Sequence, residues 1–290
     1  MTAALPGPLV STEWLAANLD APNLRVLDAT VHLHPAENGG MTMESGRADY
    51  DTGHIPGAMF ADLILDLSDD KSPLRFTLPR AERFAAAMGR LGVGDDTPVV
   101  IYSGGSMSWG PRLWLMLRAF GFENAAVLDG GWRKWLAEGK ASETASGSYS
   151  AATFTANFRD GLFVDQAAVE AARNDANAVV VNALSPAQHE GTGGPHYGRA
   201  GRITGSINVP ASAMLNPEDF AFLPLDTLAE RFDEAGATAE KDLVIYCGGG
   251  IAASQVAFAQ HLLGRKPATV YDASLQEWAR DPNAAMEADG

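Results

Sequence analysis

The sequence is poor in cysteine, in basic residues and in long apolar runs. Its one cysteine, Cys247, excludes an intramolecular disulfide and a zinc site built from several cysteines. The 290 residues carry 21 Lys and Arg against 36 Asp and Glu, a net charge of −15, which argues against binding to nucleic acids or to anionic membranes. No apolar run approaches the ~18–20 residues of a bilayer-spanning helix. Residues 1–20 contain no basic residue, so no secretory signal is expected, and the sequence predicts a cytoplasmic protein.

What the sequence does contain is an internal repeat. Several blocks occur twice in the same order, about 145 residues apart. Asp129 and Trp135 of one block, for example, correspond to Asp272 and Trp278 of another. Like-ordered blocks at a nearly constant distance predict a duplicated domain. The paired blocks are 53–58 with 201–206, 99–105 with 243–249, and 127–135 with 270–278.

Each copy alternates short apolar runs with segments of helical periodicity. The runs are rich in β-branched residues, which is typical of buried parallel strands. Strand, helix and strand in this order predict an α/β fold of two tandem duplicated domains, each a mainly parallel sheet flanked by helices. The predicted strands are 24–29, 99–102, 125–128, 178–183, 243–246 and 268–271, and the predicted helices are 111–120 and 252–263.

A stretch rich in Ala, Ser, Thr and Gly separates the two copies and indicates a linker. We expect a first domain over residues 1–145, a linker over 146–160 and a second domain over 161–290. Ligands of parallel sheets bind at the carboxyl ends of the strands, so the strand-to-helix turns are the places to look for a functional site.

One of these turns carries the only cysteine. Cys247 follows the apolar run 243–246, and a glycine-rich turn leads from it into a predicted helix. Backbone N–H groups and the helix dipole at such a turn favour a thiolate, a persulfide or a bound oxyanion. The alternative is a small buried cysteine, but a core residue needs no run of glycines after it. We therefore predict that Cys247 is a nucleophile and that its sulfur is held by Gly248, Gly249, Gly250, Ile251 and Ala252.

The corresponding turn of the first copy has Ser103 in place of the cysteine. A serine nucleophile needs a neighbouring base, and no histidine lies close to it in sequence. We interpret the first copy as one without chemistry of its own, which contributes structure and an interface.

Taken together, these motifs resemble the two-domain rhodanese-like sulfurtransferases. The resemblance implies an inactive N-terminal domain and a catalytic C-terminal domain, whose loop cysteine takes sulfur from a small donor such as thiosulfate or 3-mercaptopyruvate. The Cys247 persulfide then passes the sulfur to cyanide, a thiol or another thiophilic acceptor. No metal and no organic cofactor is implied, and we expect a monomer or a weak dimer. The segments that carry the resemblance are 28–29, 53–58, 111–112, 129–132, 247–253 and 271–278.

Other functions compatible with the fold remain as alternatives. A non-catalytic binding or regulatory protein usually lacks the loop cysteine, which is present here. A cysteine-dependent phosphatase needs an arginine six positions after the cysteine, where this chain has Ala253. A cysteine hydrolase needs a nearby base, which the loop itself does not offer.

The segments that select the donor depart from the family pattern. Thiosulfate-preferring members have basic residues directly after the cysteine, where this chain has Gly248 and Gly249. Members that prefer 3-mercaptopyruvate have a histidine just before a Leu-Pro pair, where this chain has Phe76. The first of their carboxylate-binding arginines corresponds to Gln188. Neither donor is therefore assigned from the sequence.

Local residues are candidates to replace the missing arginines. We predict that Arg199 and His196 bind substrate, because both precede the repeated block 201–206 and an arginine fork suits a carboxylate. Arg202 is a weaker candidate, and the alternative for both arginines is exposure to solvent or a pair with Glu190 or Asp272. The remaining expectations concern other residues of both copies. Tyr197 is expected as a pocket or loop residue, His54 as structural, and His32 and His34 in a loop. Arg112 and Trp109 are expected at the edge of the interdomain cleft, with core packing as an equal alternative for Trp109.

Overall fold

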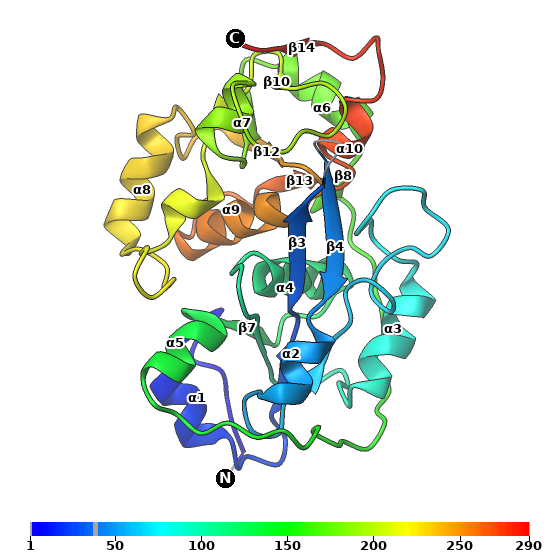
Figure 1. The fold of residues 1–290 in the computed structure, drawn as a ribbon, viewed down its shortest axis with the longest axis vertical. Helices are drawn as coiled ribbons and strands as arrows, with labels where there is room; N and C mark the ends of the chain where they lie inside the picture. The colour runs from blue at the N-terminus through cyan, green and yellow to red at the C-terminus, as the bar shows by residue number, and fades with distance from the viewer. Residues whose placement is uncertain (1, 37–39, 290) are drawn as a thin grey trace.

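The computed structural model describes residues 2–36 and 40–289 and contains two halves with the same topology (Figure 1). Each half is built on a five-stranded sheet whose neighbouring strands are all parallel. The first has the order β1 (Leu9–Val10), β7 (Ala125–Leu128), β6 (Val99–Tyr102), β2 (Arg25–Asp28) and β5 (Met59–Phe60). The second has β8 (Phe163–Val164), β13 (Thr269–Tyr271), β12 (Asp242–Tyr246), β9 (Ala178–Asn182) and β11 (Ile207–Asn208). The duplication and the predicted α/β class are confirmed.

The repeated residues make the same contacts in both halves. Tyr102 and Tyr246 each end a central strand, and their hydroxyls accept the backbone N–H groups of Ile55 and Ile203. The tryptophans of the repeated motif behave alike, because each indole N–H donates to a backbone carbonyl six or seven residues further on. These buried hydrogen bonds explain why the residue types recur: each buried donor needs a partner.

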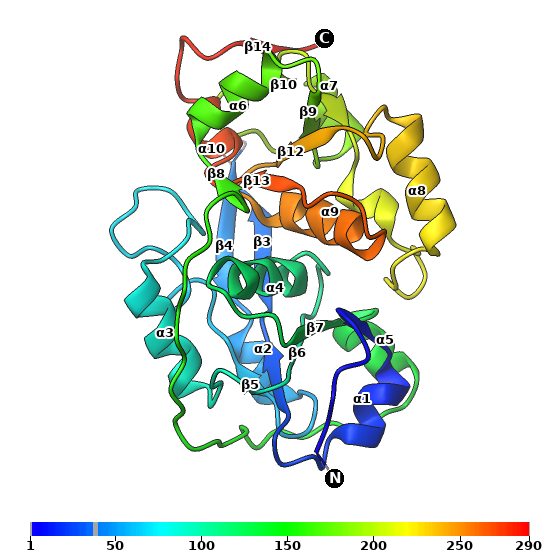
Figure 2. The ribbon, with the colours of Figure 1, turned by 180° about the vertical axis from the view of Figure 1, so that it is seen from behind.

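Helices cover both faces of each sheet, as Figure 2 shows from behind. Several begin with a side chain that accepts an N–H of the first turn, such as Asp165 before α6 and Ser185 before α7. The helices of the first half are α1 (Thr12–Asn18), α2 (Arg47–Thr52), α3 (Ala81–Arg90), α4 (Trp109–Ala119) and α5 (Gly131–Ala137). Those of the second are α6 (Gln166–Arg173), α7 (Pro186–Glu190), α8 (Leu225–Glu234), α9 (Ile251–Leu262), α10 (Leu275–Trp278) and the 3₁₀ turn η1 (Ala211–Met214).

The two halves pack together through α4 and α9, the helices that follow their central strands (Figures 1 and 2). Trp114 of α4 meets Phe258 of α9 edge to face, with the ring centroids 4.8 Å apart. Ser108 donates a buried hydrogen bond of 2.7 Å to the side chain of Gln255. Both helices are apolar around almost their whole circumference, as expected of helices buried between two domains.

A hairpin of the first half reaches across to the second. It consists of β3 (Val31–Pro35) and β4 (Met41–Ser45), which pair antiparallel and extend toward the carboxyl end of β12 (Figure 1). The prediction that His32 and His34 lie in a loop is wrong, because both are in β3. Two short strands, β10 (Arg202–Ile203) and β14 (Met286–Glu287), pair at the far end of the second half.

The predicted linker lies in extended form along the first half. The N–H groups of Gly147, Ala152 and Asn157 donate to backbone carbonyls of that half, at 3.1, 3.0 and 2.9 Å. The boundaries at 145/146 and 160/161 stay predictions. None of the helices described here has the length and hydrophobicity needed to cross a membrane.

Candidate active site

The turn from β12 to α9 holds Cys247 at the carboxyl edge of the second sheet. The cysteine is only 2% exposed, and it borders a cavity. Gly250 has a φ of 81°, a conformation that glycine adopts at low cost, and it lets the chain turn directly into α9. The positive end of a twelve-residue helix therefore points at the sulfur.

A buried serine fixes the shape of this turn from below. The Ser274 hydroxyl accepts the backbone N–H groups of Cys247 and Gly250, each at 3.1 Å, and donates to the carbonyl of Tyr271 at 2.7 Å. We expected five amides, from Gly248 to Ala252, to face the sulfur. That expectation needs correction at Gly250, because its N–H is already bonded to Ser274. The residues of the turn that line the cavity with Cys247 are Gly248, Gly249, Ile251 and Ala252.

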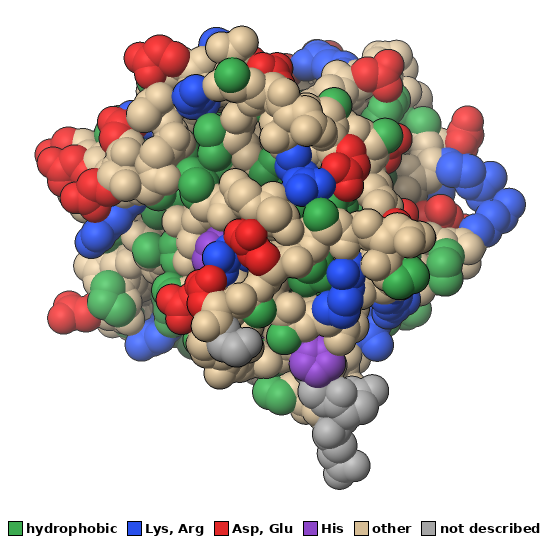
Figure 3. Space-filling model, turned by 90° about the horizontal axis from the view of Figure 1, so that it is seen from above, with side chains coloured by type: hydrophobic (Ala, Val, Ile, Leu, Met, Phe, Trp, Pro, Cys, Tyr) green, Lys and Arg blue, Asp and Glu red, His purple; other side chains and the backbone are tan. Residues whose placement is uncertain are grey.

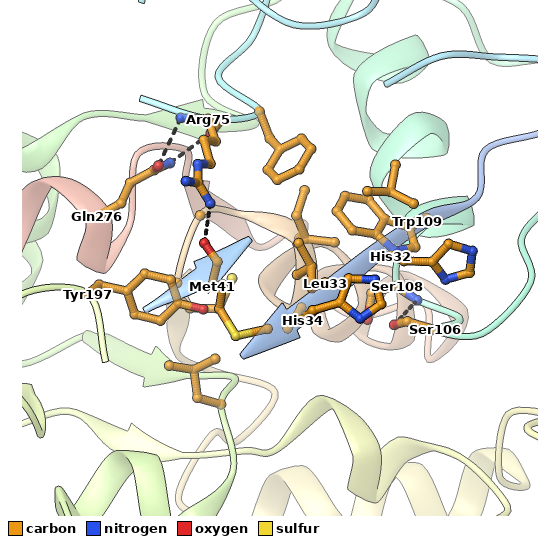
Figure 4. Close-up of a pocket in the computed structure, with 18 of the residues that line it drawn as sticks. His32, Leu33, His34, Met41, Arg75, Ser106, Ser108, Trp109, Tyr197 and Gln276 are labelled. Carbon is orange, nitrogen blue, oxygen red and sulfur yellow. Dashed lines mark hydrogen bonds between the residues drawn. The ribbon is translucent and has the colours of Figure 1, made fainter. Parts of the chain in front are cut away.

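The cavity in front of Cys247 has a volume of about 380 Å³ and lies between the two halves (Figure 4). The β3–β4 hairpin forms one side, and the first half also contributes Phe76 and Trp109, whose ring centroids are 5.0 Å apart. Most of the lining is apolar, which is typical of a site that excludes water from a small organic ligand. The hairpin residues that line the cavity are Val31, His32, Leu33, His34 and Met41.

The only Lys or Arg side chain among the described lining residues is Arg75. Its guanidinium donates to the carbonyl of Met41 on the hairpin (Figure 4). Its backbone is clamped to the second half by Gln276: the Arg75 N–H donates to Oε1 at 2.9 Å, and Nε2 donates to the Arg75 carbonyl at 2.8 Å. Arg75 was not among the residues predicted from the sequence, although a basic residue beside the unusual Phe76 was a usable signal.

A buried ion pair holds the same segment from the other side. Arg112 of α4 is 1% exposed, and its Nη2 lies 2.7 Å from Oδ1 of Asp272 and also donates to the Phe76 carbonyl. The other oxygen of Asp272 accepts the N–H of Leu78 at 2.8 Å. Arg112, expected at the edge of the cleft, is therefore beneath the site rather than in it, and it connects the two halves.

The structure places Arg199 away from the sulfur. Its guanidinium donates to four backbone carbonyls, those of Trp278, Ala279, Asp281 and Ala284, at 2.7–3.3 Å. A guanidinium engaged in this way is poorly placed to hold a substrate carboxylate. We therefore replace the predicted substrate-binding role of Arg199 with an anchoring role.

The other two polar candidates of this segment also lie outside the Cys247 cavity. His196 is exposed, and its Nδ1 accepts the N–H of Gly198 in its own loop, 3.4 Å away. Arg202 pairs with Glu287 at 2.9 Å and with Asp289 at 2.8 Å, and not with Glu190 or Asp272 as considered. Neither lines the cavity beside the cysteine.

Tyr197, in contrast, does line that cavity, next to Gly248. Burial raises the pKa of its hydroxyl well above the usual range, and the nearby Cys247 sulfur acts in the same direction. The phenol is therefore neutral at physiological pH and can donate a hydrogen bond. Within the described part of the chain, the hydroxyl has no hydrogen-bond partner.

The turn of the first copy that corresponds to the Cys247 turn does not form a comparable centre. The Ser103 hydroxyl donates to the carbonyl of Ser106 at 2.9 Å, so it is committed to its own turn. His54 is completely buried, stacks on Tyr50 and bonds to that residue's carbonyl at 2.6 Å, which fits the structural role expected of it. Among residues 2–36 and 40–289, no three His, Cys, Asp or Glu side chains are placed to hold a metal ion. The phosphatase alternative fails at Ala253, which is fully buried and carries no charge for a phosphate.

The surface away from the cavity is mixed in charge. On the end of the molecule that carries β14 and α6, acidic and basic side chains are both present, scattered among uncharged ones (Figure 3). Arg202 and its two carboxylates are part of this end. Arg202 is thus paired locally, whereas Arg75 faces a cavity with no acidic residue among its described lining.

Similarity to known proteins extends over nearly the whole chain. The Rhodanese-like domain family matches residues 11–138 and again residues 165–281. Thiosulfate/3-mercaptopyruvate sulfurtransferase 1 of Arabidopsis thaliana, a mitochondrial protein, is 34% identical over 97% of this chain and 78% of its own length. The 3-mercaptopyruvate sulfurtransferase of Escherichia coli is 32% identical over 96% of this chain and 97% of its own. The structure of SseA from Escherichia coli, a protein with the rhodanese fold, superposes with a TM-score of 0.82 at 30% identity and covers 92% of this chain and 98% of its own.

Proposed function

This chain belongs to the rhodanese-like sulfurtransferases, and from that premise we propose that Cys247 carries the transferred sulfur between a donor and an acceptor. The thiolate attacks the sulfur of the donor, an S–S bond forms, and the bond between that sulfur and the rest of the donor breaks. A thiophilic acceptor such as cyanide or a thiol then removes the outer sulfur and releases the thiolate. The observation that carries this proposal is the single cysteine at the N-terminus of α9, facing a cavity that residues of both halves line.

The turn and the helix favour both states of the sulfur. The thiolate and the persulfide are anions, and the amides at the start of a helix stabilise negative charge there. Apolar side chains of the hairpin, together with Phe76 and Trp109, line the cavity and make the surroundings of the sulfur less polar than bulk water. A less polar environment strengthens the interaction between the amides and the charged sulfur.

We further propose that the preferred donor is an organic thiol with one carboxylate, the class to which 3-mercaptopyruvate belongs. The glycines after Cys247 supply no charge for a thiosulfate dianion. Arg75 supplies a single positive charge at the cavity, and its fork suits a carboxylate. The apolar lining suits the carbon chain of such a donor better than it suits a second negative charge.

The mass of the intact protein tests the sulfur relay. After brief incubation with 3-mercaptopyruvate, we expect an added mass of about 32 Da, one sulfur atom, which cyanide or dithiothreitol removes. Thiosulfate is expected to give the same adduct more slowly. No adduct with either donor contradicts the proposal, and faster loading by thiosulfate contradicts the donor assignment alone.

Arg75→Ala is expected to raise the KM for 3-mercaptopyruvate about 10–100-fold, because a charge-assisted hydrogen bond is worth about 1.5–3 kcal/mol. Steady-state kinetics with both donors checks this. Arg80→Ala is the matched control: Arg80 is an exposed arginine of the same segment that does not line the cavity, and its KM should not change. An unchanged KM in Arg75→Ala would remove Arg75 from the binding site.

The acceptor in this proposal is a small thiophile that enters the same cavity as the donor.

Cytoplasmic localisation and a monomeric or weakly dimeric state stay predictions.

A further inference from the structure

Gly248 and Tyr197 compete for the same space. A Cβ atom on Gly248 would lie 1.9 Å from Cζ of Tyr197 and 2.0 Å from its hydroxyl oxygen, so a side chain at position 248 requires the tyrosine ring to move. The tyrosine ring therefore occupies the volume that a side chain at position 248 would take. The φ of Gly248 is not in the left-handed region, so the backbone alone does not demand glycine there. With the ring in this position, the turn has room only for a glycine at 248.

The segment that brings Tyr197 to this place is anchored on both sides. Arg199 holds the segment to the end of α10 and the chain that follows it, because its guanidinium donates to four backbone carbonyls between residues 278 and 284. Gln188 donates from Nε2 to the carbonyl of Pro195 at 2.9 Å and ties the segment to α7. Gly198, with a φ of 141°, passes so close to Ala279 that a Cβ would lie 2.8 Å from its carbonyl oxygen. This segment therefore places one aromatic side chain on the catalytic turn.

The Tyr197 hydroxyl is available for a ligand. It points away from its own loop toward Met41 and the cavity that Cys247 borders (Figure 4). The neutral phenol has a proton to donate, and no group among the described residues accepts it. Arg75 lines the same cavity, so a carboxylated ligand held by Arg75 would be within the space that the phenol faces.

We propose that Tyr197 is a specificity-determining residue, whose hydroxyl donates a hydrogen bond to the oxygen of the group that leaves the sulfur and whose ring excludes a side chain at position 248. This proposal rests on the function proposed above and names which donors that function accepts. It selects donors whose leaving group carries its developing charge on a single enolate-type oxygen.

With 3-mercaptopyruvate the step balances within the two reactants. The Cys247 thiolate forms the S–S bond, the carbon–sulfur bond breaks, and its electron pair becomes the enolate of pyruvate. The proton of the donor thiol passes to the enolate carbon, which leaves the persulfide anion and pyruvate. Tyr197 keeps its own proton and stabilises the enolate oxygen while charge is on it. Sulfite, the group that leaves from thiosulfate, carries two charges that a neutral phenol does not neutralise.

Tyr197→Phe tests the hydrogen bond, since it keeps the ring and removes only the hydroxyl. We expect kcat for 3-mercaptopyruvate to fall about 100-fold with little change in KM, the effect of removing one donor to a developing oxyanion. The rate with thiosulfate should change less than about threefold, because one neutral hydrogen bond matters little to sulfite. Tyr149→Phe is the control, because that hydroxyl bonds the carbonyl of Gly57 in the first half, outside the cavity; it should not change either rate. An unchanged kcat with 3-mercaptopyruvate in Tyr197→Phe overturns the proposed role of the hydroxyl.

Two variants test whether Tyr197 and a side chain at position 248 compete for the same volume. Gly248→Ser alone should lower the rate with both donors at least about 10-fold, because Tyr197 blocks the serine side chain. Tyr197→Ala combined with Gly248→Ser should recover the thiosulfate rate but not the 3-mercaptopyruvate rate. If Gly248→Ser alone is as active as the parent, or if the double variant recovers neither rate while its unfolding is unchanged, the proposed competition is wrong. Persulfide formation by the parent protein is measured in the same experiment. If the parent forms no persulfide, the proposed function is wrong; if it does, the variants test Tyr197 alone.

Discussion

Cys247→Ser is expected to lower the rate of sulfur transfer more than about 10³-fold with either donor, because a serine hydroxyl is neither ionised at neutral pH nor able to form a stable bond to sulfur. The substitution replaces one atom in a side chain that is 2% exposed, so the fold should stay intact. Intact-protein mass spectrometry should detect no added sulfur, and circular dichroism should be that of the parent. A variant that still transfers sulfur at a rate close to the parent's would contradict the proposed mechanism.

The first half supplies the matched control. Ser103 stands at the position that corresponds to Cys247, but its hydroxyl is bonded within its own turn. Ser103→Ala should therefore leave sulfur transfer unchanged, whereas loss of activity would mean that the first turn takes part in the reaction. Comparing Cys247→Ser with Ser103→Ala therefore shows whether only the turn of the second half takes part in the reaction.

The catalytic turn and the scaffold around it were predictable because their signals are local. The apolar runs at 99–102 and 243–246 coincide with or fall within the central strands β6 and β12, and the glycines mark the turns that follow. Short apolar runs rich in β-branched residues are typical of buried parallel strands, and the duplication repeats each central run in the second copy. The position of Cys247 before α9 followed from the same pattern.

The residues that surround the sulfur were not predictable, because they come from distant parts of the chain. Arg75 is held at the cavity in part by Gln276, 201 positions later, which bonds its backbone to the second half. Arg199 was closer in sequence to the expected site, yet backbone carbonyls of the C-terminal segment take up its donors. Sequence spacing indicates which groups are available, whereas the partners of a long side chain are set by tertiary packing.

The first half, which has no cysteine, therefore forms part of the active-site cavity. It contributes the β3–β4 hairpin, the aromatic pair of Phe76 and Trp109, and the only lysine or arginine among the described cavity residues. Its own turn has a serine in place of the cysteine, but the loop that carries Arg75 remains tied to the second half at Gln276 and Asp272. Without the first half, Cys247 would lose the hairpin, the aromatic pair and Arg75 from its surroundings.

Arg112→Met is expected to lower the free energy of unfolding by about 3–5 kcal/mol, because it leaves the Asp272 carboxylate beside an apolar side chain. The guanidinium contributes a 2.7 Å ion pair, a hydrogen bond to the Phe76 carbonyl and a contact over the ring of Phe163 at 4.7 Å. Methionine replaces neither the ion pair nor the hydrogen bond. Urea denaturation followed by fluorescence measures the loss, and Arg90→Met, which breaks the exposed pair with Asp66, should cost less than about 1 kcal/mol.

The same substitution should weaken donor binding, since Asp272 also accepts the N–H of Leu78 in the segment that carries Arg75. We expect the KM for 3-mercaptopyruvate to rise in Arg112→Met, and the double variant with Asp272→Asn to be less destabilised than the sum of the single changes. That coupling arises because asparagine removes the uncompensated charge while its side-chain oxygen can still accept from Leu78. If the single and double variants unfold with additive losses, Arg112 and Asp272 act independently, and the connection between the two halves must depend on Gln276 and the α4–α9 contact instead.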